Sequence, residues 1–102
     1  MPRLDLMERL TTTIRREWLC EIIAGRKTVE HREIKPYWIK RLEGRKCPFS
    51  LRLINGRHMN APEVTVQIDQ VRKNSHTGYY ELVIGRVIDY RNWNKEDECP
   101  EN

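Results

Sequence analysis

Three strand-like segments in the C-terminal half constrain this chain most strongly. Apolar and polar residues alternate over 49–53 and 64–69, as in strands with one buried face; Val71 extends the second run, and 79–90 is interpreted as a third strand. An Asn55-Gly56 pair, a strong turn signal, follows the first of them, and a polar segment separates the other two. These connections are too short for helical crossovers, so we expect the three strands to pair antiparallel.

The N-terminal half alternates between strand and helix signals. Segments 11–14 and 28–34 are rich in β-branched residues and predict short strands, whereas 1–10 predicts a turn of helix or a disordered arm. A helix follows each strand, the first ending at Gly25 and the second beginning at Pro36. Their apolar positions are Trp18, Leu19, Ile22 and Ile23 in the first helix and Tyr37, Trp38, Ile39 and Leu42 in the second.

The whole chain has only 102 residues. That length allows one small domain and excludes a TIM barrel, which needs roughly 250 residues. We expect an α+β fold in which a bent, mostly antiparallel sheet closes into a small β-barrel and two helices plug its open side. Residues 1–92 form this domain, and the polar, acidic segment 93–102 is predicted to be a disordered tail.

The charges are unevenly distributed along the chain. The net charge is +4, but residues 1–88 carry 17 bases and 10 acids, a balance of +7. Thirteen of the 19 bases are arginines, whose planar guanidinium suits phosphates and base edges. A basic body indicates a polyanionic partner. The simpler interpretation is a solvated surface that keeps the protein soluble.

Membrane, disulfide and zinc classes find no support in the sequence. No apolar run approaches the roughly 20 residues that span a bilayer, and the N-terminus has no apolar signal-peptide core. The three cysteines, Cys20, Cys47 and Cys99, are far apart, as are the three histidines. We therefore expect a reduced, cytoplasmic protein with no metal, no cofactor and no membrane contact.

The densest polar cluster is GRKTVEHREIK, residues 25–35. Strand periodicity places Thr28, Glu30 and Arg32 on one face, where Glu30 and Arg32 can pair. Lys27 lies at the helix-to-strand junction and can turn toward the same cleft. Such groups together can bind an anion, orient a water or polarise a carbonyl. The structural alternative is an ordinary ion pair, with Lys27 extended into solvent.

The spacing G-x-K-x-x-E-x-R, directly after an amphipathic helix, resembles the signature of the ASCH domain family; its positions here are Gly25, Lys27, Glu30 and Arg32. The continuation REIKPYWIKRL is similar to the small stand-alone ASCH proteins of bacteria and phages. The resemblance extends to the closing segment YYELVIGRVIDY. It implies a PUA-like β-barrel that binds RNA or a nucleotide-like ligand in a cleft lined by the motif residues.

The resemblance also suggests a role for each charged residue. Lys27 contacts a phosphate or a base carbonyl, and Arg32 contacts a phosphate. Glu30 either accepts a hydrogen bond from an exocyclic amine or holds Arg32 in place. The remaining ligand-binding candidates in this stretch are Gly25, Arg26 and Thr28.

Enzymatic activity is the alternative that the resemblance leaves open. Some small bacterial ASCH proteins are amidohydrolases that deacetylate N4-acetylcytidine, and others are reported to cleave RNA without a metal, which makes Lys27 and Glu30 candidates for catalysis. The amidohydrolases carry a Thr where this chain has Glu30, and they use a further carboxylate, for which Glu63 and Glu81 are candidates. A third hypothesis is a protein-interaction domain whose motif only stabilises the fold.

Two further candidates for ligand contact lie outside the motif. Trp38 combines an aromatic ring with neighbouring bases, as a stacking platform needs, although a helical Trp is more often a core residue. Arg86 is one of several arginines on or beside the strands that can line a phosphate track. Neighbours in a strand face opposite ways, so we expect one ring of Tyr79-Tyr80 to be buried and the other free to stack.

Overall fold

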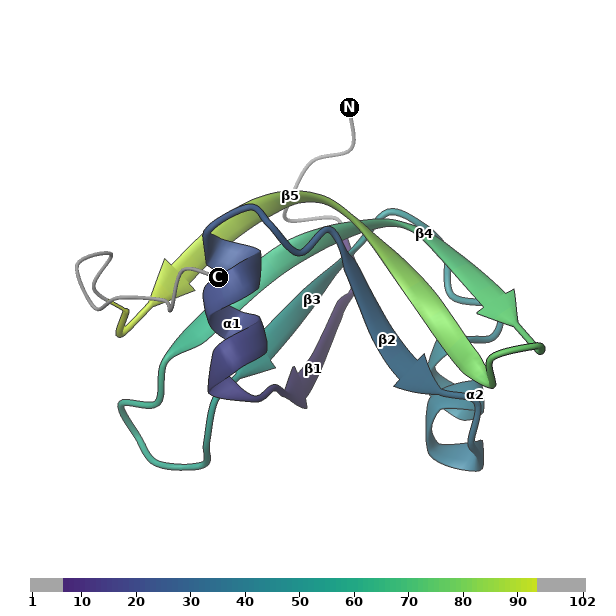
Figure 1. Ribbon diagram of the computed structural model, residues 1–102, viewed down its shortest axis with the longest axis horizontal. Helices are drawn as coiled ribbons and strands as arrows, with labels where there is room; N and C mark the ends of the chain where they lie inside the picture. The colour runs from purple at the N-terminus through teal and green to yellow at the C-terminus, as the bar shows by residue number, and fades with distance from the viewer. Residues whose placement is uncertain (1–6, 94–102) are drawn as a thin grey trace.

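Seven elements follow one another in the predicted order in the computed structural model, which describes residues 7–93 (Figure 1). They are β1 (Arg9–Thr13), α1 (Arg16–Ile23), β2 (Val29–Glu33), α2 (Pro36–Leu42), β3 (Phe49–Ile54), β4 (Glu63–Asn74) and β5 (Tyr79–Arg91). The predicted α+β class, with two helices and three consecutive strands at the end, is confirmed.

The five strands form one curled sheet in the order β1-β3-β4-β5-β2. β1 runs parallel to β3, and the other neighbours are antiparallel, as predicted for the last three strands. The sheet arches into a half-barrel (Figure 1) and does not close as we expected, because β1 and β2 remain edge strands. The Arg32 side chain on β2 hydrogen-bonds to the end of β1. This side-chain contact bridges the gap that backbone hydrogen bonds between β1 and β2 would close in a complete barrel.

The bend of the sheet is concentrated in its two longest strands. β4 and β5 have 12 and 13 residues, and their pairing register shifts three times between Thr65 and Gln70. Gly85 lies opposite one of these irregularities, and a Cβ atom there would collide with the carboxylate of Asp69. Glycine is therefore needed for the close approach of the two strands, which confirms the bulge or close approach predicted at Gly85.

The core lies under the arch of the sheet, where α1 packs against β4 and β5, while α2 lies beside the end of β2 (Figure 1). Alternate strand residues point inward and meet Leu19 and Ile22 of α1, both almost fully buried. The buried cluster comprises Leu10, Ile14, Leu19, Ile22, Leu42, Phe49, Leu51, Leu53, Val64, Val66, Ile68, Tyr80 and Leu82. This buried cluster does not fill the gap between the edge strands β1 and β2, which is lined largely by polar groups.

The first strand begins earlier than the sequence predicts. β1 starts at Arg9, inside the segment 1–10 that was predicted to be a turn or an arm. Leu10 is buried in the core, and Arg9 stands opposite Ser50 in the parallel pairing with β3. A partner about 40 residues away therefore decides the conformation of this segment, and short-range propensity does not contain that information.

The predicted tail, 93–102, lies outside the described residues except for Trp93. That residue packs against the core, and the Arg16 guanidinium stands 4.8 Å from its ring centroid. The folded part therefore extends at least one residue beyond the predicted boundary. Within the described residues, no helix combines the length and the apolar character that crossing a membrane requires.

Replacing Gly85 with Ala is expected to lower the free energy of unfolding by about 1–3 kcal/mol, because the added methyl group overpacks against Asp69. In an Asp69→Ala background the same change should cost less, since the colliding carboxylate is gone. Urea denaturation of the single and double variants measures this coupling. An identical cost of Gly85→Ala in both backgrounds would contradict the close approach.

Candidate functional site

A cavity of about 870 Å³ opens at the gap between the edge strands β1 and β2. We call it the motif cleft; its lining residues are Thr13, Ile14, Arg15, Trp18, Lys27, Glu30, His31, Arg32, Asn55 and Tyr79. They come from the end of β1 and its connection to α1, the start of α1, the α1–β2 connection, strand β2, the β3–β4 connection and the beginning of β5. The three charged motif residues, Lys27, Glu30 and Arg32, thus line a single cavity.

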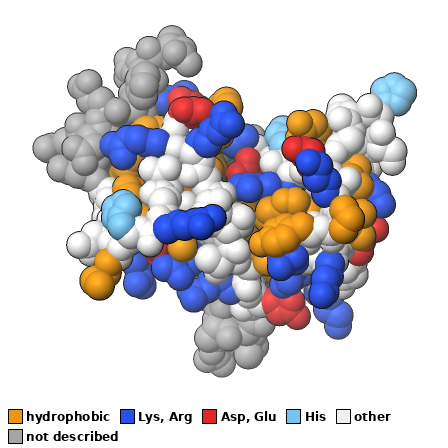
Figure 2. All heavy atoms as spheres, turned by 90° about the horizontal axis from the view of Figure 1, so that it is seen from below, with side chains coloured by type: hydrophobic (Ala, Val, Ile, Leu, Met, Phe, Trp, Pro, Cys, Tyr) orange, Lys and Arg blue, Asp and Glu red, His pale blue; other side chains and the backbone are white. Residues whose placement is uncertain are grey.

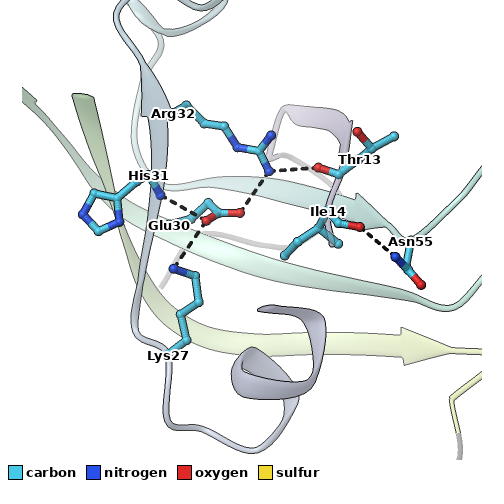
Figure 3. Close-up of polar contacts among 7 residues, drawn as sticks. All are labelled: Thr13, Ile14, Lys27, Glu30, His31, Arg32 and Asn55. Carbon is cyan, nitrogen blue, oxygen red and sulfur yellow. Dashed lines mark hydrogen bonds and ion pairs between the residues drawn. The ribbon is translucent and has the colours of Figure 1, made fainter. Parts of the chain in front are cut away.

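The Glu30 carboxylate is the centre of the polar contacts in the motif cleft (Figure 3). Its side chain is only 7% exposed. One oxygen accepts a hydrogen bond from Nη2 of Arg32 at 2.9 Å. The other accepts from the backbone N–H of His31 at 3.0 Å and lies 3.5 Å from Nζ of Lys27. The predicted Glu30–Arg32 pair and the turn of Lys27 into the same cleft are both confirmed.

Arg32 connects the two edges of the sheet. Its Nη2 also donates to the backbone carbonyl of Thr13, at 2.9 Å, so one guanidinium joins the end of β1 to Glu30 on β2 (Figure 3). On another side the guanidinium stands 5.2 Å from the ring centroid of Trp38. Arg32 is thereby fixed by contacts with both edge strands and with α2, and its charge lines the motif cleft.

The end of α1 determines where Lys27 points. Gly25 adopts a left-handed conformation with φ of +81°, and the next two backbone N–H groups, of Arg26 and Lys27, both donate to the carbonyl of Glu21 at 3.0 Å. The Arg26 side chain also pairs with Glu21, through a 2.6 Å contact. Lys27 instead enters the motif cleft, where its Nζ lies 5.1 Å from the ring centroid of Trp18.

Exposed aromatic rings stand at the sides of the motif cleft. Trp18 is 46% exposed and Tyr79 is 40% exposed, although both line the cavity. The ring of His31 meets Tyr79 edge-on, with 6.2 Å between centroids. Tyr80 is fully buried, so the predicted division of the Tyr79-Tyr80 pair is confirmed. The motif cleft is therefore lined by cations and by accessible ring surface beside them.

Several sequence candidates do not line the motif cleft. Arg86 donates to the side chain of Gln67, at 3.3 Å, in the middle of the sheet. Thr28 is exposed, and its carbonyl accepts from Ile84 in the ladder with β5. Trp38 is partly buried against the core and meets the cleft only through Arg32. Gly25 and Arg26 shape the turn before Lys27 and are themselves outside the cavity.

Several cleft residues were missed by the sequence reasoning, and Trp18 and Asn55 are two of them. Trp18 was predicted to be on the apolar face of α1, and its half-exposed ring shows that it stands at the edge of that face. Asn55 was interpreted only as a turn residue, but its Nδ2 donates to the carbonyl of Ile14 at 2.9 Å (Figure 3). A lysine shortly after a helix that carries a Trp is a weak sequence signal that Trp18 lies beside Lys27. No local sequence pattern indicates that Asn55 lines the cleft.

The additional carboxylates suggested for catalysis lie elsewhere. Glu63 lines a second cavity of about 420 Å³, where it accepts two hydrogen bonds from Arg52, at 3.0 and 2.7 Å. These bonds, together with the nearby charges of Arg91 and Arg9, hold the pKa of Glu63 below its ordinary value. Glu81 pairs with an arginine on β4, at 3.3 Å. Neither carboxylate lines the motif cleft.

The described part of the chain contains no cluster of side chains that could bind a metal ion. Among residues 7–93, no group of three or more His, Cys, Asp and Glu side chains is placed to hold a metal ion. The motif cleft itself offers one carboxylate, and two cations already occupy it.

Substituting Glu30 with Gln should lower the free energy of unfolding by about 3 kcal/mol, because two largely buried cations lose their counter-charge. Glu33→Gln on the same strand is the matched control: Glu33 pairs with Lys35 at 3.0 Å, but both side chains are more than half exposed. That change should cost about 1 kcal/mol or less. Equal losses in urea denaturation would show that Glu30 does not organise the cleft.

The Arg52–Glu63 pair should make stability depend on pH. The folded state lowers the pKa of Glu63, so the pair stabilises the protein above the unfolded-state pKa, near 4.5. This contribution is lost as the pH falls through the folded-state pKa. Thermal melts between neutral and acidic pH should show the wild type losing stability faster than Glu63→Gln below about pH 4.5. A difference between the two proteins that stays constant with pH would contradict this assignment.

No family model, curated protein or solved structure matches this chain. The resemblance to the ASCH family therefore stays a prediction, made from the motif at residues 25–32 and the segments around it.

Proposed function

We propose that this chain binds RNA or a nucleotide-like ligand in the motif cleft. The observation that carries the proposal is the arrangement around Glu30. A buried carboxylate holds Lys27 and Arg32 in place, and an exposed aromatic ring stands beside Lys27. Cations next to accessible rings are the combination that binds a phosphate together with a base.

Each part of a nucleotide has a counterpart in the motif cleft. Lys27 and the exposed Arg15 supply positive charge for a phosphate, and Arg32 strengthens that field. Trp18 and Tyr79 offer ring surface on which a base can stack. The cleft is lined by three cationic side chains and one carboxylate, so it favours an anion.

Charge and sequence resemblance support the same ligand class. Residues 1–88 carry a balance of +7, which favours a polyanion over a neutral small molecule. The motif G-x-K-x-x-E-x-R resembles that of the ASCH family, whose PUA-like domains are thought to bind RNA or nucleotides. The structure adds a physical reason for the spacing, since the Lys, Glu and Arg positions form one connected network.

The contacts of Glu30 favour binding over the enzymatic alternative. Both carboxylate oxygens already accept hydrogen bonds or face a cation, which suits a residue that positions Lys27 and Arg32. A general base needs a lone pair free to take a proton from the substrate, and these contacts already use three of the roughly four that a carboxylate offers. Release of acetate from N4-acetylcytidine, or shortening of RNA, that is lost in Lys27→Ala would support the enzyme instead.

Fluorescence anisotropy of a labelled RNA trinucleotide across a salt series tests the proposal. Wild-type binding should weaken with salt, and Lys27→Ala should lower affinity about tenfold and reduce the salt slope by roughly 0.7, the value for one phosphate contact on a single strand. Trp18→Ala should also weaken binding about tenfold, with the slope unchanged, because it removes a stacking surface.

Arg86→Ala is the matched control for charge. Arg86 is exposed and lines neither of the two cavities described above, so its removal should leave the affinity nearly unchanged. Absence of salt-dependent binding would refute the proposal. So would a loss of affinity in Arg86→Ala as large as that in Lys27→Ala.

A further inference from the structure

A row of cations and aromatic rings continues from the motif cleft onto α2. The Arg32 guanidinium in the cleft stands 5.2 Å from the ring centroid of Trp38. Trp38 meets Tyr37 edge-on, with centroids 5.1 Å apart and an interplanar angle of 76°. The guanidinium of Arg41 lies 3.4 Å from the ring centroid of Tyr37. We call these four residues the α2 row.

The outer end of the α2 row is accessible and positively charged. Tyr37 is 51% exposed, and Lys40 beside it is exposed as well, whereas the exposed Lys35 pairs with Glu33. Residues 36–42 contain no acidic residue. Figure 2 shows apolar side chains bordered mainly by Lys and Arg, with a few acidic side chains among them, on the face of the molecule seen from below. The exposed ring of Tyr37 is therefore connected to the motif cleft through Trp38 and Arg32.

We propose that the α2 row is a second RNA-contacting surface, so that the ligand of the motif cleft is a single strand of several nucleotides. This inference rests on the proposed function. Proteins that bind single strands combine a basic track with rings on which successive bases stack, at roughly 4 or more nucleotides per site. The excess of positive charge on α2 favours a polyanion over an uncharged protein partner.

The members of the row have different tasks. Trp38 packs against the core and so supports the row from beneath. Arg41 is already oriented, because its Nη1 donates to the backbone carbonyl of Tyr37 at 2.8 Å while the guanidinium stacks on the ring. Tyr37, half exposed, offers the ring surface for a base, and Arg41 supplies a charge for the adjoining phosphate.

The test compares a labelled single-stranded RNA trinucleotide with a decanucleotide in anisotropy titrations. The decanucleotide should bind the wild type at least tenfold more tightly, because only the longer strand reaches α2. Tyr37→Ala and Arg41→Ala should each weaken the decanucleotide about fivefold to tenfold and leave the trinucleotide unchanged. Tyr37→Phe keeps the ring and should retain wild-type affinity. Thermal melts of each variant confirm that it is folded.

Failure of this inference is distinguishable from failure of the proposed function. If Lys27→Ala weakens both RNAs while Tyr37→Ala and Arg41→Ala weaken neither, the motif cleft binds RNA and the α2 row does not, which leaves that surface to another partner such as a protein. If Tyr37→Ala weakens the affinity for the trinucleotide and the decanucleotide equally, the proposed role of the α2 row is also wrong. If Lys27→Ala and Trp18→Ala affect neither RNA, the proposed function itself is wrong.

Discussion

The ion-pair network of Glu30 is the interaction on which the rest of this small structure depends. A carboxylate that is 7% exposed is costly to bury unless its charge is matched, and here Arg32 and Lys27 match it from two sides. The same network orients both cations. Arg32 further binds the carbonyl of Thr13, so the pairing that neutralises Glu30 also ties together the two edges of the sheet.

The double role of the Glu30 network follows from the incomplete closure of the barrel. Five strands curl into a half-barrel whose edge strands β1 and β2 never pair, and an open edge exposes backbone groups that must be protected. The backbone N–H of His31 is satisfied by Glu30, and the carbonyl of Thr13 by Arg32. Polar side chains therefore complete the fold at the gap, and their charges remain close enough to solvent to meet a ligand. The residues that complete the fold at the gap are thus the same ones that we propose to bind the ligand.

Local patterns in the sequence predicted the elements well, because each strand and helix follows from its own periodicity. The pairing of Glu30 with Arg32 was also predictable, since it depends only on the two-residue repeat of one strand. Contacts across the gap between the edge strands could not be predicted. Thr13 and Asn55 lie at the end of β1 and in the β3–β4 turn, and no sequence pattern relates these segments to the motif. The open barrel was missed for the same reason: strand alternation does not say whether the two edge strands meet.

The central claim is that ligand binding occurs at the Glu30 network and not at the arginine-rich cavity around Glu63. NMR titration of isotope-labelled protein with a short single-stranded RNA tests it most directly, because every described amide reports its own surroundings. The largest shift changes should fall on the Trp18 indole and on the amides of Lys27, His31 and Tyr79. Changes confined to the residues around Arg52 and Glu63, with the motif cleft unaffected, would contradict it.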